Sequence, residues 1–235
     1  MRELTYNGIN LKTYGIRVSG DGEWKKPAPD ITRTQVPGRS GDLIVFNNRY
    51  ENVDISYTLS IVSNFDSNFA QAVGMLLSSP GYKKLTDSTH PGVYRMALVE
   101  TGISPAMSPS GKNGEFEVVF NCKPQIYLDS GDTEQTFTAS GTITNPTAFR
   151  SLPLIRVYGN GTLSAGGASI TVTGNTSNYI DIDCDIQDAY RGATNCNDKI
   201  TLNSGKFPEI SSGTSAVTIS GGITSVKITP RWWRL

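Results

Sequence analysis

The sequence predicts a mainly β protein built from two domains. Residues 53–61 alternate apolar and polar side chains, which is the pattern of a long strand with one buried face. Residues 145–235 contain short apolar segments separated by Gly, Asn and Pro, as in a β-sandwich or jelly roll. The chain has 235 residues, so two domains of about 100–150 residues can each bury a core.

The first domain is expected to be β-sandwich-like and to carry a projecting β-hairpin. Two extended arms at 31–36 and 43–46 flank residues 37–42, where Pro and Gly favour a turn. Strands at 93–100 and 115–123 should close its sheet, because the apolar residues of the latter segment share one face.

One helix is predicted after the long strand. Phe65, Phe69, Val73 and Leu76 recur at steps of three or four, which indicates an apolar stripe that packs on the adjacent sheet. Asn64 or Asp66 can cap the start of this helix, and Pro80-Gly81 should end it.

The second domain is expected to follow a polar stretch, 129–135, that contains no large apolar residue. We place the boundary near Gly131, which gives domains at 1–130 and 131–235. Its short strands are predicted at 154–158, 169–172, 179–182, 199–202, 216–219 and 226–229. No fixed sequence period is present, which disfavours a solenoid, a propeller or a fibre stalk.

Composition restricts the function classes. The 21 basic and 21 acidic residues balance, so bulk charge does not draw the chain to nucleic acid or to anionic lipid. No apolar stretch approaches a membrane span, and the polar start lacks a signal segment, so we expect a soluble protein made in a cytosol. Cys122, Cys184 and Cys196 suit reduced, partly buried thiols, although pairing of Cys184 with Cys196 stays open.

No arrangement of side chains predicts catalysis, a cofactor site or a metal site. Asp181, Asp183 and Asp185 should project from one strand face, which suggests a solvated surface more than a cation site or a glycosidase pair. His90 lies in a turn-forming sequence without a metal or relay partner. Gly159-Asn-Gly lacks the third glycine of a dinucleotide fingerprint, so we interpret it as a hairpin turn.

Two adjacent tryptophans near the carboxyl end must face opposite sides of a strand. We therefore expect Trp232 or Trp233 to lie in the core and the other, taken as Trp233, to form a subunit contact. Stacking on sugars or bases is the alternative role for this pair.

Together these segments resemble the distal tail protein, or Dit, of long-tailed siphophages. The resemblance is carried by Val36-Pro-Gly-Arg-Ser-Gly-Asp-Leu, Phe120-Asn-Cys-Lys-Pro-Gln, Asn145-Pro-Thr, Pro153-Leu-Ile-Arg-Val-Tyr-Gly-Asn-Gly, Ile180-Asp-Ile-Asp, Asp188-Ala-Tyr, Phe207-Pro-Glu-Ile, Ser220-Gly-Gly and Pro230-Arg-Trp-Trp. Each fragment is short, but their number and order extend over nearly the whole chain. The surroundings of Cys184, Asp185 and His90 lie outside the pattern, so no family role is assigned to them.

The resemblance implies a non-enzymatic, homo-hexameric ring in the virion, at the distal end of the tail. The hairpin would be the belt of the amino-terminal domain, and the second domain would be a galectin-like sandwich. In this family the first domain stacks between the major tail tube protein and the tail-associated hub protein. The second domain can carry receptor-binding or other baseplate components, and DNA passes through the ring.

The expected subunit contacts lie at the hairpin tip and near the carboxyl end. They are Val36, Pro37, Gly38, Arg39, Ser40, Gly41, Asp42 and Trp233. A free hairpin edge can be completed by strand addition from a neighbour, and Arg39 can add a charge-assisted bond across the seam. Two alternative functions are a carbohydrate-binding module that uses Tyr158, Tyr179 or Trp233, and a glycosidase that uses Asp181 to Asp185.

Overall fold

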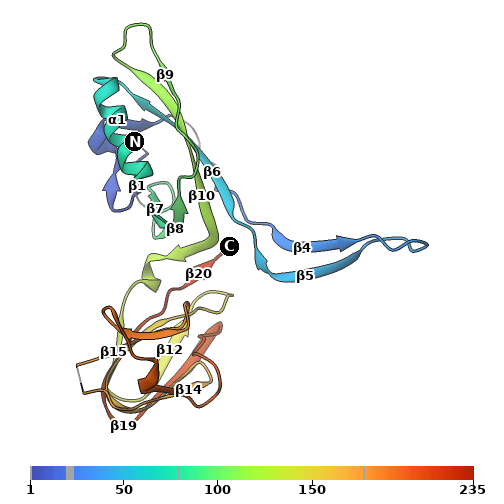
Figure 1. Cartoon of the computed structure of the whole chain (residues 1–235), viewed down its shortest axis with the longest axis vertical. Helices are drawn as coiled ribbons and strands as arrows, with labels where there is room; N and C mark the ends of the chain where they lie inside the picture. Colours follow the sequence, from blue (N-terminus) through green and yellow to red (C-terminus); the bar gives the residue numbers. More distant parts are fainter. Residues whose placement is uncertain (1, 20–23, 79, 177) are drawn as a thin grey trace. The chain divides into compact units, whose positions relative to one another are not determined.

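The computed structural model describes residues 2–19, 24–78, 80–176 and 178–235. It divides into two compact units, the first formed by residues 1–126 with Leu235 and the second by residues 127–234. The division falls within one long strand, β10, a few residues before the boundary that the polar stretch indicated. Figure 1 shows a mainly β chain with one α-helix, which confirms the predicted fold class.

Unit 1 contains one large sheet and a separate two-stranded hairpin. Its strands are β1 (Leu4–Tyr6), β2 (Ile9–Asn10), β3 (Ile16–Val18), β4 (Pro29–Thr34), β5 (Leu43–Tyr50), β6 (Val53–Ile61), β7 (Lys83–Asp87), β8 (Val93–Leu98), β9 (Pro105–Met107) and β10 (Gly114–Leu128). The main sheet has the order β2-β1-β7-β8-β10-β6-β3, with β9 (Pro105–Met107) and β20 (Trp233–Arg234) each added to β10. Among the described strands, β4 and β5 pair only with each other.

The register between β6 and β10 explains the core of unit 1. The two strands are antiparallel, and Leu59 pairs with Phe116 while Ile55 pairs with Phe120. All four side chains are buried, because the period-two alternation directs them to the same face of the sheet. The strand predicted at 53–61 is therefore confirmed with the same bounds.

The helix α1 (Phe65–Leu77) covers this core. Phe65, Ala72 and Leu76 are buried on it, and Phe69 packs edge-on against Phe116 with ring centroids 5.0 Å apart. The apolar stripe thus packs on the sheet as predicted. Asn64 precedes the helix in the left-handed conformation, but its side chain makes no capping hydrogen bond.

Unit 2 is a second antiparallel β structure. Its strands are β11 (Gln135–Phe137), β12 (Gly141–Asn145), β13 (Leu154–Ala165), β14 (Ala168–Val172), β15 (Ile180–Asp183), β16 (Asp188–Arg191), β17 (Thr194–Asn195), β18 (Ile200–Leu202), β19 (Gly213–Thr229) and β20 (Trp233–Arg234). The order β11-β19-β13-β15-β16-β17 forms one path, β12 also pairs with β19, and β14 joins β13 to β18. Trp232 is 2% exposed and belongs to the core of this unit.

Two expectations for unit 2 are wrong. The strands predicted at 216–219 and 226–229 are a single strand, β19, which pairs with β13 from Leu154 to Ala165. Gly159 and Gly161 lie inside β13 and not in a hairpin turn, and the register shifts between Tyr158 and Gly159. The glycines permit close approach to β19, since a Cβ on Gly159 would lie 2.2 Å from the carbonyl oxygen of Gly222.

Candidate interaction surfaces

The hairpin formed by β4 and β5 exposes an unusual amount of apolar surface. Leu43, Ile44 and Val45 are each about half exposed, and Phe46 is 65% exposed. Side chains of this size are normally buried, and four in succession on a surface mark an interaction site. The predicted projecting hairpin is therefore present; its first arm begins two residues earlier than the sequence indicated, and its second arm is longer.

The two faces of the hairpin differ in chemistry. The register pairs Ile31 with Phe46 and Arg33 with Ile44, so these four side chains lie on one face. We call them the Phe46 face. No hydrogen bond or ion pair holds Arg33 in the described part of the chain, so this face combines apolar side chains with an unneutralised cation.

The opposite face is polar toward the root of the hairpin. The amide of Asn47 donates to the carboxylate of Asp30 over 2.8 Å and to the hydroxyl of Thr32 over 3.2 Å. Arg49 also donates to Asp30. β5 bulges between Asn47 and Arg49, where Asn48 has the left-handed conformation. The pairing register with β4 therefore shifts between Pro29 and Ile31.

The tip of the hairpin carries the predicted contact residues 36–42. A backbone hydrogen bond of 3.2 Å from Arg39 to Val36 closes a turn there. Gly38 and Gly41 both have positive φ angles, of 80° and 84°, which explains why the turn uses glycine. All seven tip residues are exposed, so they are accessible to a partner.

Buried groups anchor the segment that enters the hairpin. Arg95 of β8 is 0% exposed, and its guanidinium donates a hydrogen bond of 2.8 Å to the carbonyl oxygen of Lys25. The same guanidinium lies 5.2 Å from the ring centroid of Trp24. The indole N–H of Trp24 donates to the hydroxyl of Tyr57 over 3.0 Å. This network fixes the chain just before β4, and burial lowers the pKa of Arg95.

The anchor continues to a buried carboxylate. The hydroxyl of Tyr57 donates to Asp87 over 3.0 Å, and Arg2 and Thr89 also donate to Asp87. Burial alone would raise the pKa of Asp87, but the hydrogen bonds from Arg2 and Thr89 outweigh it and hold this pKa below its ordinary value. His90 stacks on Trp24 with ring centroids 4.1 Å apart, so it supports the same site.

The expected solvated row of carboxylates in unit 2 is wrong for two of its three members. Asp181 and Asp183 are 5% and 6% exposed, while Asp185 is exposed. Arg156 holds Asp181 with bonds of 2.6 and 2.9 Å, and Arg231 holds Asp183 with bonds of 2.7 and 2.8 Å. Burial opposes the ionised form of Asp183, but the bond from Arg231 prevails and lowers its pKa.

The three cysteines were expected to be reduced and partly buried. Cys122, Cys184 and Cys196 are free and buried. Burial raises the pKa of the Cys122 thiol to about 12 and also raises that of Cys184, so neither is a reactive thiolate. Ile186, which follows Asp185 in the turn after β15, is 63% exposed. No group of three His, Cys, Asp or Glu suited to a metal occurs in the described ranges.

The aromatic candidates near β13 and β20 have intramolecular partners. Trp233 is half-buried, stacks on Phe149 at 4.4 Å, and donates from its indole N–H to the carbonyl oxygen of Arg150 over 2.9 Å. The centroids of the Tyr158 and Tyr179 rings are 6.1 Å apart, and the guanidinium carbon of Arg156 lies 4.1 Å from the centroid of the Tyr179 ring.

Among the described helices none is long and apolar enough to cross a membrane.

Comparison with known proteins gives matches of structure only. No protein-family model matches the chain, and no curated protein matches its sequence. The crystal structure of the SPP1 Dit (gp 19.1) protein, described as a paradigm of the hub adsorption apparatus in phages that infect Gram-positive bacteria, superimposes with a TM-score of 0.69. The identity is 13%, and the match covers 100% of both chains.

The chain has a Dit-like fold. The phage p2 baseplate in its activated conformation with Sr matches as well, with a TM-score of 0.53, 12% identity, and 97% and 98% of the two chains covered. These matches confirm the predicted resemblance to Dit at the level of fold. They span both units and the hairpin.

Sequence reasoning missed the groups that support this Dit-like fold from within. Arg95 and Trp24 belong to no motif, and their partners are distant in the sequence. The apolar character of the arm 43–46 was the available signal for an exposed surface, because such a run outside the main sheet has no core to enter. The tip residues 36–42 were named instead because the turn sequence predicted a hairpin and the resemblance to Dit implied that this hairpin is the belt.

Proposed function

We propose that the chain is a structural component of the tail tip of a long-tailed, non-contractile phage. Six copies would form a ring that connects the tail tube to the hub and the adsorption apparatus. The observation that carries this proposal is the Dit-like fold over the entire chain, since the two matched structures are a phage hub protein and a phage baseplate. Localisation in the virion tail, after synthesis in the host cytoplasm, follows from the same proposal.

The exposed hairpin supports a role in assembly. A surface with four large apolar side chains in succession favours association, and the free edges of a two-stranded hairpin can accept a neighbouring strand. A contact between unlike surfaces repeats around a ring until no surface is left open. The tip residues 36–42 and Trp233 remain the proposed contacts named from the sequence.

The paired charges of unit 2 support a structural role of the protein and argue against a hydrolytic one. Arginines hold both Asp181 and Asp183, and the bond from Arg231 lowers the pKa of Asp183, whereas a general acid needs a raised pKa. The balance of acidic and basic residues also suits a ring through which DNA passes without being bound. Salt-sensitive retention of DNA by the protein in a filter-binding assay would overturn that last point.

Unit 1 is the proposed contact surface for the major tail tube protein and for the hub protein. Unit 2 is the proposed contact surface for receptor-binding or other baseplate proteins.

The decisive experiment on ring formation is mass photometry with negative-stain imaging of the purified chain. We expect ring-shaped particles of six times the 25.4 kDa chain mass. A protein that stays monomeric at every concentration tested would overturn the proposal.

A carbohydrate-binding role for unit 2 is the second candidate. The half-exposed rings of Tyr158 and Tyr179 lie next to each other, which is the observation that favours a sugar platform. A glycan array probed with the full chain tests it, and binding that is lost in Tyr179→Ala would support it. An absence of glycan binding would remove this candidate.

A further inference from the structure

One connected part of unit 2 carries no charged side chain. Residues 135–149, 157–180, 200–205 and 210–226 contain no Asp, Glu, Lys, Arg or His, although 18% of the whole chain is charged. These segments include β12, β14, β18 and the adjoining parts of β13 and β19, which pair with one another. The surface of a soluble domain usually carries charges of both signs. An uncharged sheet with a solvent-facing side therefore indicates a surface with a particular partner.

The solvent-facing side of this sheet carries hydroxyl groups in register. Leu163 of β13 and Ile170 of β14 are buried, so the residues that alternate with them face solvent. Thr162 pairs with Thr171, which in turn pairs with Thr201 of β18. The hydroxyl patch, as we call this surface, consists of Thr162, Ser164, Ser169, Thr171, Thr201 and Asn203.

The hydroxyl patch offers neutral hydrogen-bond donors and acceptors to a partner. The hydroxyls of Thr162 and Thr171 are hydrogen-bonded over 3.0 Å, and the amide of Asn203 donates to the hydroxyl of Thr171 over 2.8 Å. In the described ranges no hydrogen bond engages the hydroxyl of Thr201 or the side-chain carbonyl oxygen of Asn203, and both residues are exposed. A partner that covers this patch must supply several neutral hydrogen bonds, because a buried hydroxyl without one is costly.

An aromatic pair adjoins the hydroxyl patch on the same side of the strand. Val157 and Leu163 are both buried, so Tyr158 and Thr162 lie on the opposite, solvent-facing side of β13. Four residues separate them by about 13 Å, at a rise of about 3.3 Å per residue. The ring of Tyr158 lies beside that of Tyr179, and the guanidinium of Arg156 covers part of the Tyr179 ring.

The charged residues that border the uncharged strands on β13 and β19 are paired. Arg156 precedes the uncharged part of β13 and is held by Asp181. Lys227 follows the uncharged part of β19 and donates to Glu134 over 2.7 Å. An anionic ligand would find no unpaired cation at this border, so the surface favours a neutral ligand.

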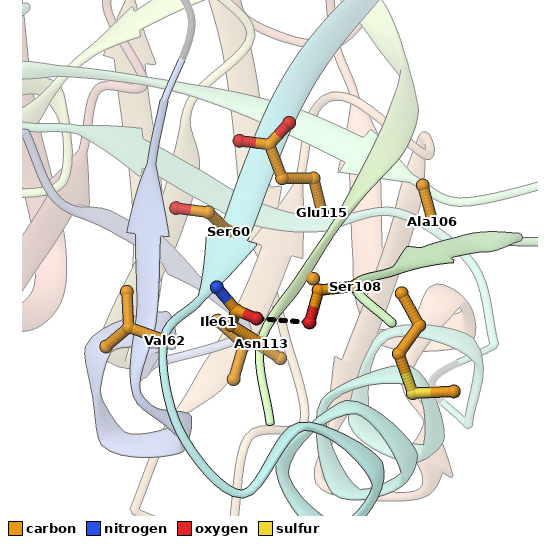
Figure 2. A pocket seen from close by; sticks show the side chains of 9 residues that line it. Ser60, Ile61, Val62, Ala106, Ser108, Asn113 and Glu115 are labelled. Carbon is orange, nitrogen blue, oxygen red and sulfur yellow. Dashed lines mark hydrogen bonds between the residues drawn. The ribbon is translucent and has the colours of Figure 1, made fainter. Parts of the chain in front are cut away.

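The groove of unit 1 has a different construction. It has a volume of about 430 Å³, and Figure 2 shows Ser60 and Glu115 among the side chains that line it. Glu115 pairs with Ser60 and shares its side of the sheet, whereas Met107 pairs with Gly114 and faces the opposite side. None of its described lining residues is aromatic, and Glu115 places a charge in it. The features of a neutral binding surface are thus combined on unit 2.

We propose that the tyrosine pair and the hydroxyl patch together bind a neutral polysaccharide chain. One sugar ring would stack its apolar side on Tyr158 and Tyr179, and the hydroxyls of following sugars would bond to Thr162, Thr201 and Asn203. Sugar hydroxyls donate and accept hydrogen bonds as those of the patch do, and a neutral sugar carries no charge that needs a counter-ion. This inference rests on the second candidate function, to which it adds the class of saccharide and the hydroxyl half of the site.

Affinity electrophoresis of the full chain tests the class of ligand. The probes are native gels that contain dextran, laminarin, mannan or galactan, which are neutral, and a gel that contains polygalacturonate, which is anionic. We expect at least one neutral polymer to slow migration and polygalacturonate to have no effect. Migration that none of the four neutral polymers slows would overturn the inference, and retardation by polygalacturonate alone would overturn the neutral class.

A pair of valine substitutions tests the hydroxyl patch. Thr162→Val with Thr171→Val removes two bonded hydroxyls together and keeps the β-branched shape, so the strands should stay folded. We expect the affinity for the retarding polymer to fall roughly tenfold. The matched control is Thr144→Val with Thr214→Val, another hydroxyl pair, 3.1 Å apart. It lies six residues along β19 from Ser220, the partner of Thr162, or about 20 Å away, and should leave binding unchanged.

Each outcome separates this inference from the other proposals. Wild-type retardation in the Thr162→Val, Thr171→Val chain would overturn the role of the hydroxyl patch and leave a site at the tyrosine pair alone. Equal losses in this chain and in the control would show a general effect of the substitutions and would also overturn it. Mass photometry of the same samples reports the proposed ring independently, since rings should form in every variant whether or not a polysaccharide binds.

Discussion

The guanidinium of Arg95 donates a hydrogen bond of 2.8 Å to the carbonyl oxygen of Lys25, four residues before β4 begins at Pro29. Arg95 is fully buried, and its other terminal nitrogen donates to the carbonyl oxygens of Lys123 and Pro124. One side chain thus joins the main sheet to the segment that leads into the hairpin. The orientation of an exposed hairpin depends on such a fixed root.

Arg95→Met should loosen the hairpin root and destabilise unit 1. The change leaves buried carbonyl oxygens without a donor, which we expect to cost about 3 kcal/mol of unfolding free energy. Urea denaturation measures this loss, and hydrogen exchange should show faster exchange near Lys25. Arg17→Met, at an exposed position of β3, should stay within about 0.5 kcal/mol of the wild type. Equal losses for both variants would contradict the anchoring role.

Asp183→Asn should destabilise unit 2 more than loss of a surface pair does. It leaves Arg231 partly buried without its counter-ion, so we expect a loss of about 3 kcal/mol in chemical denaturation. The matched control is Glu209→Gln, which breaks the exposed ion pair with Arg150 and should cost less than about 1 kcal/mol. A cost for Asp183→Asn no larger than that of the control would show that the buried pair contributes little.

Stability should fall in acid because of Asp87 and Asp183. Both carboxyls have a pKa below the ordinary value in the folded chain, so their contribution is complete above about pH 4. It is lost as the pH falls through the folded pKa values, where protonation removes the bonds from Arg2 and Arg231. Urea unfolding across this range checks the slope. Asp87→Asn should flatten it, and an unchanged slope in that variant would contradict the assignment.

Gly159→Ala should be strongly destabilising. The new Cβ would lie 2.2 Å from the carbonyl oxygen of Gly222, and the φ angle of 92° is already strained for alanine. We expect a loss of about 3 kcal/mol or more, measured by thermal or urea unfolding. Gly174→Ala separates the two causes, since Gly174 has a φ of 65° with open space around its Cβ and should cost only about 1 kcal/mol.

Replacement of residues 36–42 by a short Gly-Ser linker should leave both units folded and abolish ring formation. The tip has no partner in the core, so its removal should leave circular dichroism and unfolding of the rest unchanged. Mass photometry then reports the loss of assembly. Rings that persist would place the contact elsewhere on the hairpin, with the Phe46 face as the remaining surface.

Elements with strong local signals were predictable. The alternation in 53–61 specified β6 with its exact bounds, because a strand with one buried face imposes a period of two on its own sequence. The helix α1 followed from spacing in the same way. β19 was divided wrongly in two because Gly221 and Gly222 resemble a turn, although their real role is close approach to Gly159 and Gly161.

The sequence by itself therefore determined the β class, the helix, the turn at the hairpin tip and the burial of one of the two adjacent tryptophans. Only the tertiary structure decided the environment of the charged groups. Asp181 and Asp183 looked solvated, but their arginine partners lie 25 and 48 residues away and become neighbours only when the sheet of unit 2 forms. Periodicity reports which face of an element is buried, whereas ion pairs depend on contacts between elements that no local pattern encodes.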